Sequence, residues 1–265
     1  MKNKISFLII SDIHAGKDFE TLPGSKAFEL LDVFVDKTNS FFNPDFIVDL
    51  GDKINPHSEK EDFKILNLII DKFINLNNPS FFVQGNHDLE NLDSKLHSNL
   101  FHLHNNKKAQ MDNFNLIFLN AQDTIIEGVG GSVNKFNLNW LDQSIDDSKI
   151  NLIFTHQAII EQNLNQNIHF NKMKNLGYIQ QKDEILKIFK KHKSFKMIFN
   201  GHLHWTNINI KKDVFVSVPS FIDVWEKGKN PEGNITYVEI IDKKVILSIY
   251  SLVPFIKVTS ISFEI

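Results

Sequence analysis

Five short apolar runs of this chain are each followed, within a few residues, by aspartate, asparagine or histidine. The runs span residues 5–11, 45–50, 80–83, 151–155 and 195–199. Such runs are typical of strands that are buried on both faces of a sheet. Because ligands bind at the carboxyl ends of strands in open α/β sheets, we expect the polar residues that follow these runs to share one site. These residues are Asp12, His14, Asp52, Asn86, His87, His156, His202 and His204.

Segments with helical spacing separate several of the runs. Residues 25–40 and 59–76 repeat apolar side chains three and four positions apart, which predicts helices that cover a sheet. Residues 137–145 and 182–192 are also expected to be helical. The alternation of strand and helix predicts an α/β core.

The middle of the chain is less regular. Residues 116–120 are expected to form a strand, and the glycine-rich residues 128–131 a turn. Residues 157–181 are rich in Asn and Gln and have no clear periodicity. A connection of this length is more often functional than structural, so we expect it to form a loop over the active face.

The last fifty residues are β-like. Residues 214–218, 236–241 and 245–252 are strand candidates, and residues 242–244 are expected to form a hairpin turn between the last two. We therefore expect antiparallel strands to complete the sheet of the α/β core.

The residues at the strand ends are suited to binding metal ions. Carboxylate, amide and imidazole groups without thiolates favour Mn²⁺, Fe²⁺ or Zn²⁺. Seven such ligands suit two ions that share a carboxylate, and Asp52 is the expected bridge. Two ions about 4 Å apart can hold a phosphate ester, lower the pKa of a bound water and stabilise the leaving oxygen. Gly201 is expected to let the backbone turn tightly before His202.

Each of these residues also has a structural interpretation. Asp12 can cap a helix, Asp52 can form a turn, Asn86 can adopt a left-handed conformation and His156 can be a hydrogen-bonded core histidine. At any single position the structural interpretation is favoured. Taken together the positions favour a shared metal site, because chance seldom places such residues after five strands.

His87 has a separate expected role. Its position beside Asn86 predicts that it contacts the phosphoryl group or protonates the leaving oxygen, with Asp88 orienting its ring. A purely structural histidine is the alternative. Five other histidines lack a comparable context and are expected to lie in solvent or in loops: His57, His102, His104, His169 and His192.

The composition limits the classes of partner. The formal charge is −3 and no arginine is present among the 265 residues, so metal ions would have to replace arginine in binding phosphate. The absence of cysteine excludes thiolate zinc sites and cysteine nucleophiles. The apolar run near the N-terminus is too short for a signal peptide and leads directly into Asp12, and no run is long enough to span a membrane. We therefore expect a cytoplasmic protein.

The motifs Asp12-x-His14, Gly51-Asp52, Gly85-Asn86-His87-Asp88, His156 and Gly201-His202-x-His204 resemble, in this order, those of the calcineurin-like metallophosphoesterase superfamily. The resemblance implies an α/β fold, namely the two-layer αββα metallophosphoesterase sandwich with mixed central sheets flanked by helices. We expect one such domain over residues 1–265, with a core of residues 1–206 and a β-rich completion of residues 207–265.

The resemblance also implies the ligand sets. By the family pattern Asp12, His14, Asp52 and His204 would hold one metal ion, and Asp52, Asn86, His156 and His202 would hold the other. We expect Asp52 and His87 to be catalytic, and Asn86, His87 and His202 to contact the substrate.

Within the superfamily the chain is most similar to the class III cyclic-nucleotide phosphodiesterase and glycerophosphodiesterase branch. The similarity rests on the length, on the spacing of residues 51–55 before a long helix, on the helix before the His156 strand and on the hairpin at 236–252. That branch usually has a second His and a Pro after the metal-binding His, whereas this chain has Gln157 and Ala158. The substrate end of the pocket is therefore expected to differ, while every ligand position is kept.

We predict a dinuclear metal-dependent phosphoric ester hydrolase that attacks phosphorus with a metal-bound hydroxide. Small phosphodiesters such as cyclic nucleotides or glycerophosphodiesters are the preferred substrates. The alternatives are a phosphomonoesterase or nucleotide pyrophosphatase of the same superfamily, and a non-catalytic binding module that retains the fold. No nucleic-acid polymer or membrane partner is expected, because the chain offers neither a basic groove nor an amphipathic membrane helix. A homo-oligomer is compatible with the sequence.

Overall fold

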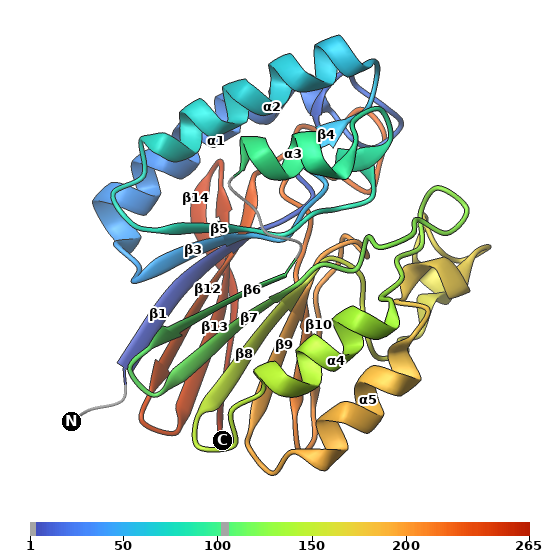
Figure 1. Cartoon of the computed structure of the whole chain (residues 1–265). Coiled ribbons are helices and arrows are strands. Elements are labelled where there is room, and N and C mark those ends of the chain that lie inside the picture. The colour runs from blue at the N-terminus through green and yellow to red at the C-terminus, as the bar shows by residue number, and fades with distance from the viewer. Residues whose placement is uncertain (1–3, 102–105) are drawn as a thin grey trace.

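The computed structural model describes residues 4–101 and 106–265. Within these residues two six-stranded mixed sheets face each other (Figure 1). The first has the strand order β14-β13-β12-β1-β3-β5, and the second has the order β10-β11-β9-β8-β7-β6. The first sheet contains β1 (Lys4–Ile10), β3 (Phe46–Asp49), β5 (Ser80–Phe82), β12 (Asn234–Ile241), β13 (Lys244–Leu252) and β14 (Phe255–Glu264). The second contains β6 (Asn106–Met111), β7 (Phe114–Leu119), β8 (Ile150–Thr155), β9 (Lys196–Asn200), β10 (Asn207–Ile210) and β11 (Val214–Ser217).

The parallel strands of each sheet are the apolar runs of the sequence. β1, β3 and β5 are parallel to one another, and so are β7, β8, β9 and β11. β12 pairs antiparallel with β1 and continues into β13 and β14, so the C-terminal strands complete the first sheet as expected. A short parallel pair, β2 (Ala15–Gly16) with β4 (Ile54–Asn55), joins the loops that follow β1 and β3.

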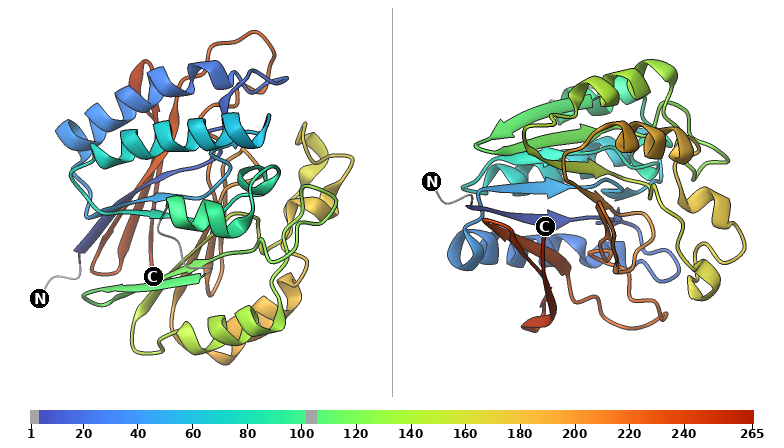
Figure 2. Two further views of the ribbon diagram at one scale, coloured as in Figure 1. Left: turned by 45° about the horizontal axis from the view of Figure 1, so that its top comes forward. Right: turned by 90° about the horizontal axis from the view of Figure 1, so that it is seen from below.

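Helices cover the outer face of each sheet (Figure 2). The first sheet is covered by α1 (Ala27–Lys37), α2 (Glu59–Ile74) and α3 (Ser94–Leu100), and the second by α4 (Lys135–Ser144) and α5 (Lys182–Lys191). α1 is shorter than expected because it continues as a π-helix over Thr38–Phe42, which ends at the left-handed Asn43. α2 begins where Ser58 Oγ accepts a hydrogen bond from the backbone of Glu61.

Three large apolar clusters fill the spaces between the layers. One lies between the two sheets, where the Phe7 ring stacks on Phe46 at 4.8 Å and meets the edge of Phe199. The other two lie beneath the helices on the outer faces. This layering confirms the αββα fold that the resemblance implies. Phe63, one of the apolar side chains whose spacing predicts the helix over residues 59–76, is 39% exposed.

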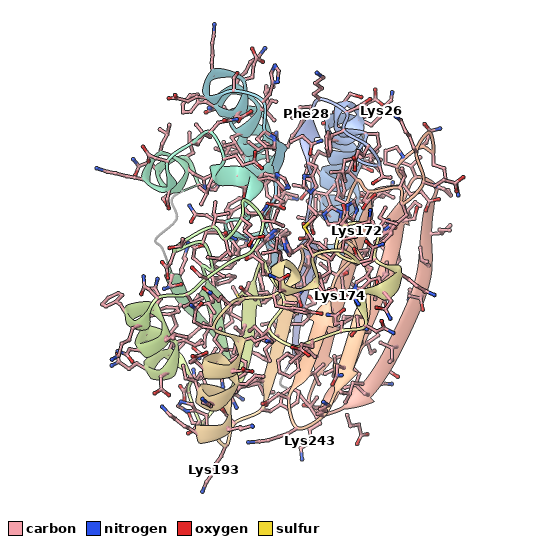
Figure 3. All side chains as sticks on the ribbon, turned by 90° about the vertical axis from the view of Figure 1, so that its right-hand side faces the viewer. Lys26, Phe28, Lys172, Lys174, Lys193 and Lys243 are labelled. Atoms are coloured by element: carbon pink, nitrogen blue, oxygen red, sulfur yellow. The ribbon has the colours of Figure 1, made fainter. Side chains whose placement is uncertain are left out.

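The lysines divide into two kinds. Labelled side chains such as Lys193 and Lys243 extend from the surface (Figure 3). Lys53 and Lys196 are fully buried. A buried ammonium group requires acceptors inside the protein. For Lys53 these acceptors are Asp49, Asp88 and the backbone oxygen of Val83.

Candidate metal centre

The loops that follow the parallel strands hold unusual backbone conformations. Asp12, His14, Asp52, His202 and His204 all have positive φ, between 44° and 63°. Non-glycine residues seldom adopt this conformation, and such strain is concentrated at functional sites. The loops support each other, because the backbone of Asp12 donates to Gly51 O at 3.0 Å and that of His14 donates to Asp52 O at 3.0 Å.

Two glycines are required here because the chains approach closely. A Cβ on Gly201 would overlap Ser11 Oγ, and a Cβ on Gly85 would overlap the backbone nitrogen and the carboxylate of Asp52. The expectation that Gly201 supplies a tight turn is therefore only partly right. The left-handed conformation belongs to the next residue, His202, and Gly201 provides the space beside β1.

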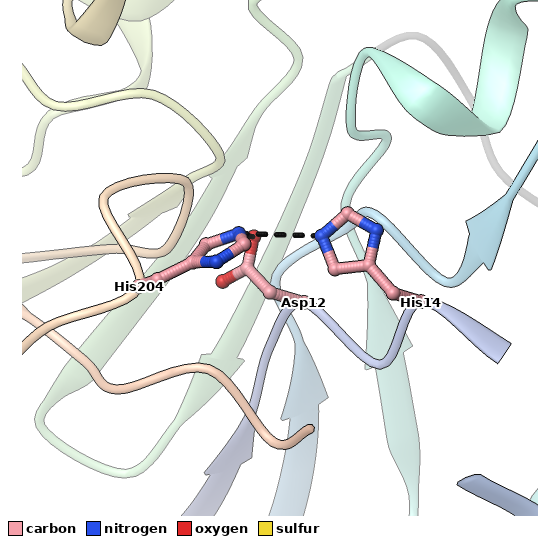
Figure 4. A group of neighbouring side chains, drawn as sticks. All are labelled: Asp12, His14 and His204. Carbon is pink, nitrogen blue, oxygen red and sulfur yellow. Dashed lines mark hydrogen bonds and ion pairs between the residues drawn. The ribbon is translucent and has the colours of Figure 1, made fainter. Parts of the chain in front are cut away.

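Two groups of side chains could each hold a metal ion, and we call them donor groups. The first consists of Asp12, His14 and His204 (Figure 4). All three side chains are buried. His14 Nε2 lies 3.2 Å from His204 Nε2, and His204 Nε2 lies 3.5 Å from Asp12 Oδ1. Asp12 also accepts the backbone N–H of His202, which fixes its carboxylate.

The second group consists of Asp52, His156 and His202. His156 Nε2 lies 3.1 Å from Asp52 Oδ2 and 3.2 Å from His202 Nδ1. The same oxygen of Asp52 lies 4.0 Å from His14 Nε2 in the first group. Asp52 therefore stands between the two groups, in the position that a bridging carboxylate would occupy.

Hydrogen bonds on the outer side orient three of these imidazole rings. His204 Nδ1 lies 2.8 Å from Asp223 Oδ2, His156 Nδ1 lies 2.8 Å from Leu50 O, and His202 Nε2 lies 3.1 Å from Leu176 O. Carboxylate and carbonyl oxygens only accept hydrogen bonds, so these nitrogens donate. The opposite nitrogen of each ring is then left with a lone pair that points into its group, as in metal-binding histidines.

The directions of these lone pairs show whether the two groups are suited to metal ions. With the outer nitrogens of His156 and His202 as donors, their inner nitrogens would face each other at 3.2 Å without a proton between them. The inner nitrogens of His14 and His204 also lie 3.2 Å apart, close to Asp12 and Asp52. A divalent cation in each group would be coordinated by these ring nitrogens and carboxylates.

When no metal ion is bound, protons on imidazole rings supply the positive charge next to the carboxylates. Burial lowers the pKa of His156 and His204, but neighbouring carboxylates outweigh it and raise the pKa values to about 9 and about 10. Burial lowers the pKa of His14 to about 3, so this ring stays neutral. The site therefore carries positive charge either as protons or as metal ions.

Within the Asn86-His87-Asp88 motif, His87 lies beside the first donor group. Asn86 is buried, and its Oδ1 accepts a hydrogen bond from Gln157 Nε2 at 3.5 Å. The His87 ring lies 5.1 Å from that of His14, and its Nδ1 lies 2.6 Å from Glu90 Oε1. Burial lowers the pKa of His87, but Asp52 and Glu90 outweigh it and raise the pKa above its usual value.

The prediction that Asp88 orients the His87 ring is wrong. Asp88 Oδ2 lies 3.1 Å from Lys53 Nζ and accepts the backbone N–H of Gly85 at 3.0 Å. The 3₁₀ turn over His87–Leu89 explains this difference, because residues three apart share a side of such a turn while the next residue points away. The carboxylate that pairs with the His87 ring is that of Glu90, and its spacing of three from His87 is the signal that could have identified it.

The sequence interpretation also missed His169 and Asp223. His169 lies in a loop as expected, but its Nε2 lies 2.6 Å from Asp223 Oδ2, which also meets His204, and this link to the donor groups was not expected. His192 lies in the loop after α5 as expected, where it pairs with Asp142 and Asp147. His57 is exposed in a loop as expected, and His102 and His104 lie outside the described residues.

A cavity of about 640 Å³ opens over both groups. His14, Asp52, His87, His202 and His204 are among its lining residues. The loop 157–181 contributes Ile168, His169, Phe170 and Met173, which confirms that it covers the active face. Phe19, which is 60% exposed, adds an aromatic ring to the lining.

Comparisons with solved structures find the same fold at low identity. A dimetal phosphatase from Danio rerio aligns over 98% of both chains with 14% identity and a TM-score of 0.76. The purple acid phosphatase PPD1 from yellow lupin seeds aligns over 99% of this chain and 54% of its own, with 9% identity and a TM-score of 0.68. GAP50 of Plasmodium, described as the anchor in the inner membrane complex, aligns over 99% of this chain and 89% of its own, with 12% identity and a TM-score of 0.63.

No curated protein matches the chain. Among the described residues no helix is both long enough and apolar enough to cross a membrane. The family model for calcineurin-like phosphoesterases matches residues 5–206, which is most of the chain and contains all of the donors above. The chain therefore belongs to the calcineurin-like phosphoesterase family, whose fold and grouped donors indicate a hydrolase that acts on phosphoesters with divalent metal ions.

Proposed function

We propose that the protein is a dinuclear metal-dependent phosphodiesterase that hydrolyses small phosphodiesters of the cyclic-nucleotide or glycerophosphodiester type. The observation that supports this most strongly is the position of Asp52 Oδ2 between two groups of inward-facing donors in one cavity. The proposal treats residues 1–265 as a single domain, which the pairing of β12 with β1 supports.

The proposed ligand sets follow from this geometry. Asp12, His14, Asp52 and His204 would hold one ion, and Asp52, Asn86, His156 and His202 the other. Asn86 would join the second set by giving up its long contact with Gln157, which is 3.5 Å. Mn²⁺, Fe²⁺ or Zn²⁺ suit these donors. When bound, such ions hold phosphoryl oxygens, activate water and stabilise the leaving oxygen.

The residues of the chain then bind and orient the substrate. His87 reaches the cavity beside His14, and Glu90 holds its ring. We assign to His87 the contact with the phosphoryl group, or the transfer of a proton to the leaving oxygen. Asn86 would contact the same phosphoryl group through its Nδ2 group. His202 would act on this group only through the metal ion, because its Nε2 donates to Leu176 O and its Nδ1 faces the second donor group.

The cavity favours a small substrate. Its volume of about 640 Å³ lies within the usual range for small-molecule sites. Among the described residues, its lining includes the acidic Asp18, Glu20 and Glu90 and one lysine, Lys17. This excess of acidic groups disfavours a polyanion such as nucleic acid, whose binding depends on neutralising phosphates with basic residues.

A substrate panel on metal-loaded protein tests the proposal. The full chain is loaded separately with Mn²⁺, Fe²⁺ and Zn²⁺ and assayed with bis(p-nitrophenyl) phosphate, p-nitrophenyl phosphate, cyclic nucleotides and glycerophosphodiesters. We expect the diesters to react faster than the monoester. Faster hydrolysis of the monoester would favour the phosphomonoesterase alternative. No turnover, together with no bound metal, would favour the non-catalytic module.

A further inference from the structure

The C-terminal strand β14 is an open edge of the first sheet. It pairs with β13 on one side and, among the described residues, with no strand on the other. All residues from 256 to 262 are exposed, including the apolar side chains of Ile256, Val258 and Ile261. Natural proteins usually protect so long an edge, because its free N–H and C=O groups can pair with another chain.

The other edges of the two large sheets are better protected. β5 has only three residues. β6 carries Lys107 and Lys108 at consecutive positions, and β10 has only four residues and is followed by Lys211 and Lys212. Short strands and lysines are common means of blocking edge pairing. β14 has ten residues, one lysine and no proline, so its edge is the least protected of the four.

A bulge in β14 brings its two charged residues onto one face of the sheet. The register with β13 shifts at Val258, which is therefore an extra residue. In a regular strand Lys257 and Glu264 would face opposite sides, because they are seven positions apart. With the bulge both lie on the outer face, where Lys257 Nζ lies 5.5 Å from the centre of the Tyr250 ring.

This arrangement makes the strand complementary to itself about Ile261. When the bulge is set aside, Lys257 and Glu264 lie three steps along the strand on either side of Ile261. A second copy turned by a two-fold axis through this position would run antiparallel to the first. Lys257 of each copy would then lie beside Glu264 of the other on the outer face. The two Ile261 side chains would meet on the inner face.

We propose that β14 is the pairing surface for a second copy of this chain, so that two first sheets join through antiparallel β14 strands into one continuous sheet. The charges favour this partner over an unrelated strand. Only pairing between identical copies requires Lys257 and Glu264 to lie on one face at equal distances from the centre. The inference is independent of the proposed function, because no residue of β14 lines the cavity over the metal centre.

Sedimentation equilibrium of the full chain measures this association. We expect the wild type at about 100 µM to have twice the 30.7 kDa mass of one chain and to dissociate on dilution. Ile261→Lys brings two ammonium groups together at the two-fold axis, so this variant should stay monomeric at the same concentration. Ile74→Lys is the matched control. Ile74 is also exposed but lies in α2, so its variant should associate like the wild type.

Exchange of the two charges tests the register. Lys257→Glu would bring carboxylates together in a dimer, and Glu264→Lys would bring ammonium groups together. The dimer dissociation constant of each variant alone should therefore rise about tenfold or more. An equimolar mixture of the two variants should associate as tightly as the wild type, because each copy then meets an opposite charge at both ends of the strand. A change of structure within one chain would not produce this rescue.

Three results would overturn the inference. The first is a wild type that stays monomeric at the highest concentration. The second is a dimer that Ile261→Lys does not weaken, which would place the interface elsewhere. The third is a mixture of Lys257→Glu and Glu264→Lys that associates no more tightly than either variant alone.

Discussion

Two clusters of ionisable side chains lie buried side by side in this protein. The metal-centre cluster contains Asp12, His14, Asp52, His156, His202 and His204. The lysine cluster contains Asp49, Lys53, Asp88 and His97. The clusters adjoin in the sequence at Asp52 and Lys53, and every member is buried. They differ in how far the protein itself satisfies their charges and hydrogen bonds.

The ammonium group of the lysine cluster has a full set of acceptors. Lys53 Nζ lies 3.1 Å from Asp49 Oδ1, 3.1 Å from Asp88 Oδ2 and 2.8 Å from Val83 O. In the metal-centre cluster no lysine pairs with Asp12 or Asp52 within the described residues, and nitrogen atoms face nitrogen atoms at 3.2 Å. A buried cluster whose own lysine neutralises its carboxylates supports the fold. The metal-centre cluster has no such lysine, so its carboxylates are neutralised by protons on the imidazole rings or by metal ions.

The largest expected effect comes from Asp52→Ala. This change removes the oxygen that stands between the two donor groups, so we expect both ions to be lost and turnover to be abolished. Metal analysis and hydrolysis of bis(p-nitrophenyl) phosphate measure this. Asp49→Asn is the control in the lysine cluster and should keep both ions. Near-normal activity of Asp52→Ala would remove the bridging assignment.

Lys53→Met should act on stability. It leaves Asp49 and Asp88 buried without their cation, which costs about 3–5 kcal/mol of unfolding free energy when a buried pair is broken in this way. Urea unfolding of the metal-loaded proteins measures the loss. Lys196→Met is the matched control, because Lys196 is equally buried but its aspartate, Asp213, is partly exposed and 3.7 Å away. Equal losses of unfolding free energy in the two variants would show that burial of the lysine, and not its pairing with Asp49 and Asp88, determines the destabilisation.

The metal-centre cluster was largely predictable because its residues follow buried strands. Buried parallel strands are continuous apolar runs, so their ends can be located in the sequence and the topology brings those ends together. The edge strands β6 and β14 were missed because exposed edges carry mixed side chains; only Ile256, Val258 and Ile261 of β14 are large exposed apolar groups. The short helix α3 was also missed.

Contacts between side chains were less predictable than strand ends. His169 pairs with Asp223 across 54 positions, and no periodic pattern connects them. Lys53 and Asp88 pair across 35 positions. Asp88 was assigned to His87 because the two are adjacent in the sequence, but adjacent residues in a turn point to different sides. Which carboxylate meets which base is decided by tertiary packing, which local patterns do not record.

Acidification should lower the free energy of unfolding through His97, a member of the lysine cluster. Burial lowers the pKa of His97 to about 4, below its ordinary value of 6.5, so the folded state binds fewer protons than the unfolded state between these values. The stabilisation is present above pH 6.5 and is lost as the pH falls towards 4. His97→Leu should therefore gain on the order of 3 kcal/mol relative to wild type over this range. Urea unfolding of both proteins at several pH values measures the difference.

Asp49 provides an internal check on that result. Burial raises the pKa of Asp49 to about 6 from 3.8, so the folded state binds more protons than the unfolded state in this window. Its contribution has the opposite sign, and acidification from pH 6 to 4 should stabilise the wild type relative to Asp49→Asn. If both variants shift in the same direction with pH, the opposing assignments within the lysine cluster are wrong.

The smallest effect is expected for Asp223→Asn, which tests the outer bonds of the metal-centre cluster. Asp223 fixes the His204 ring so that Nε2 faces its group, whereas His156 and His202 are fixed by backbone carbonyls that no substitution removes. Loss of such an orienting carboxylate weakens metal binding by about 10–100-fold. Calorimetric titration of Mn²⁺ into the metal-free proteins measures this, with Asp142→Asn, which removes a partner of His192, as the control. Unchanged Mn²⁺ affinity in Asp223→Asn would mean that Asp223 is not needed to orient the His204 ring. The left-handed backbone conformation at residue 204 would then be sufficient to direct the ring toward its group.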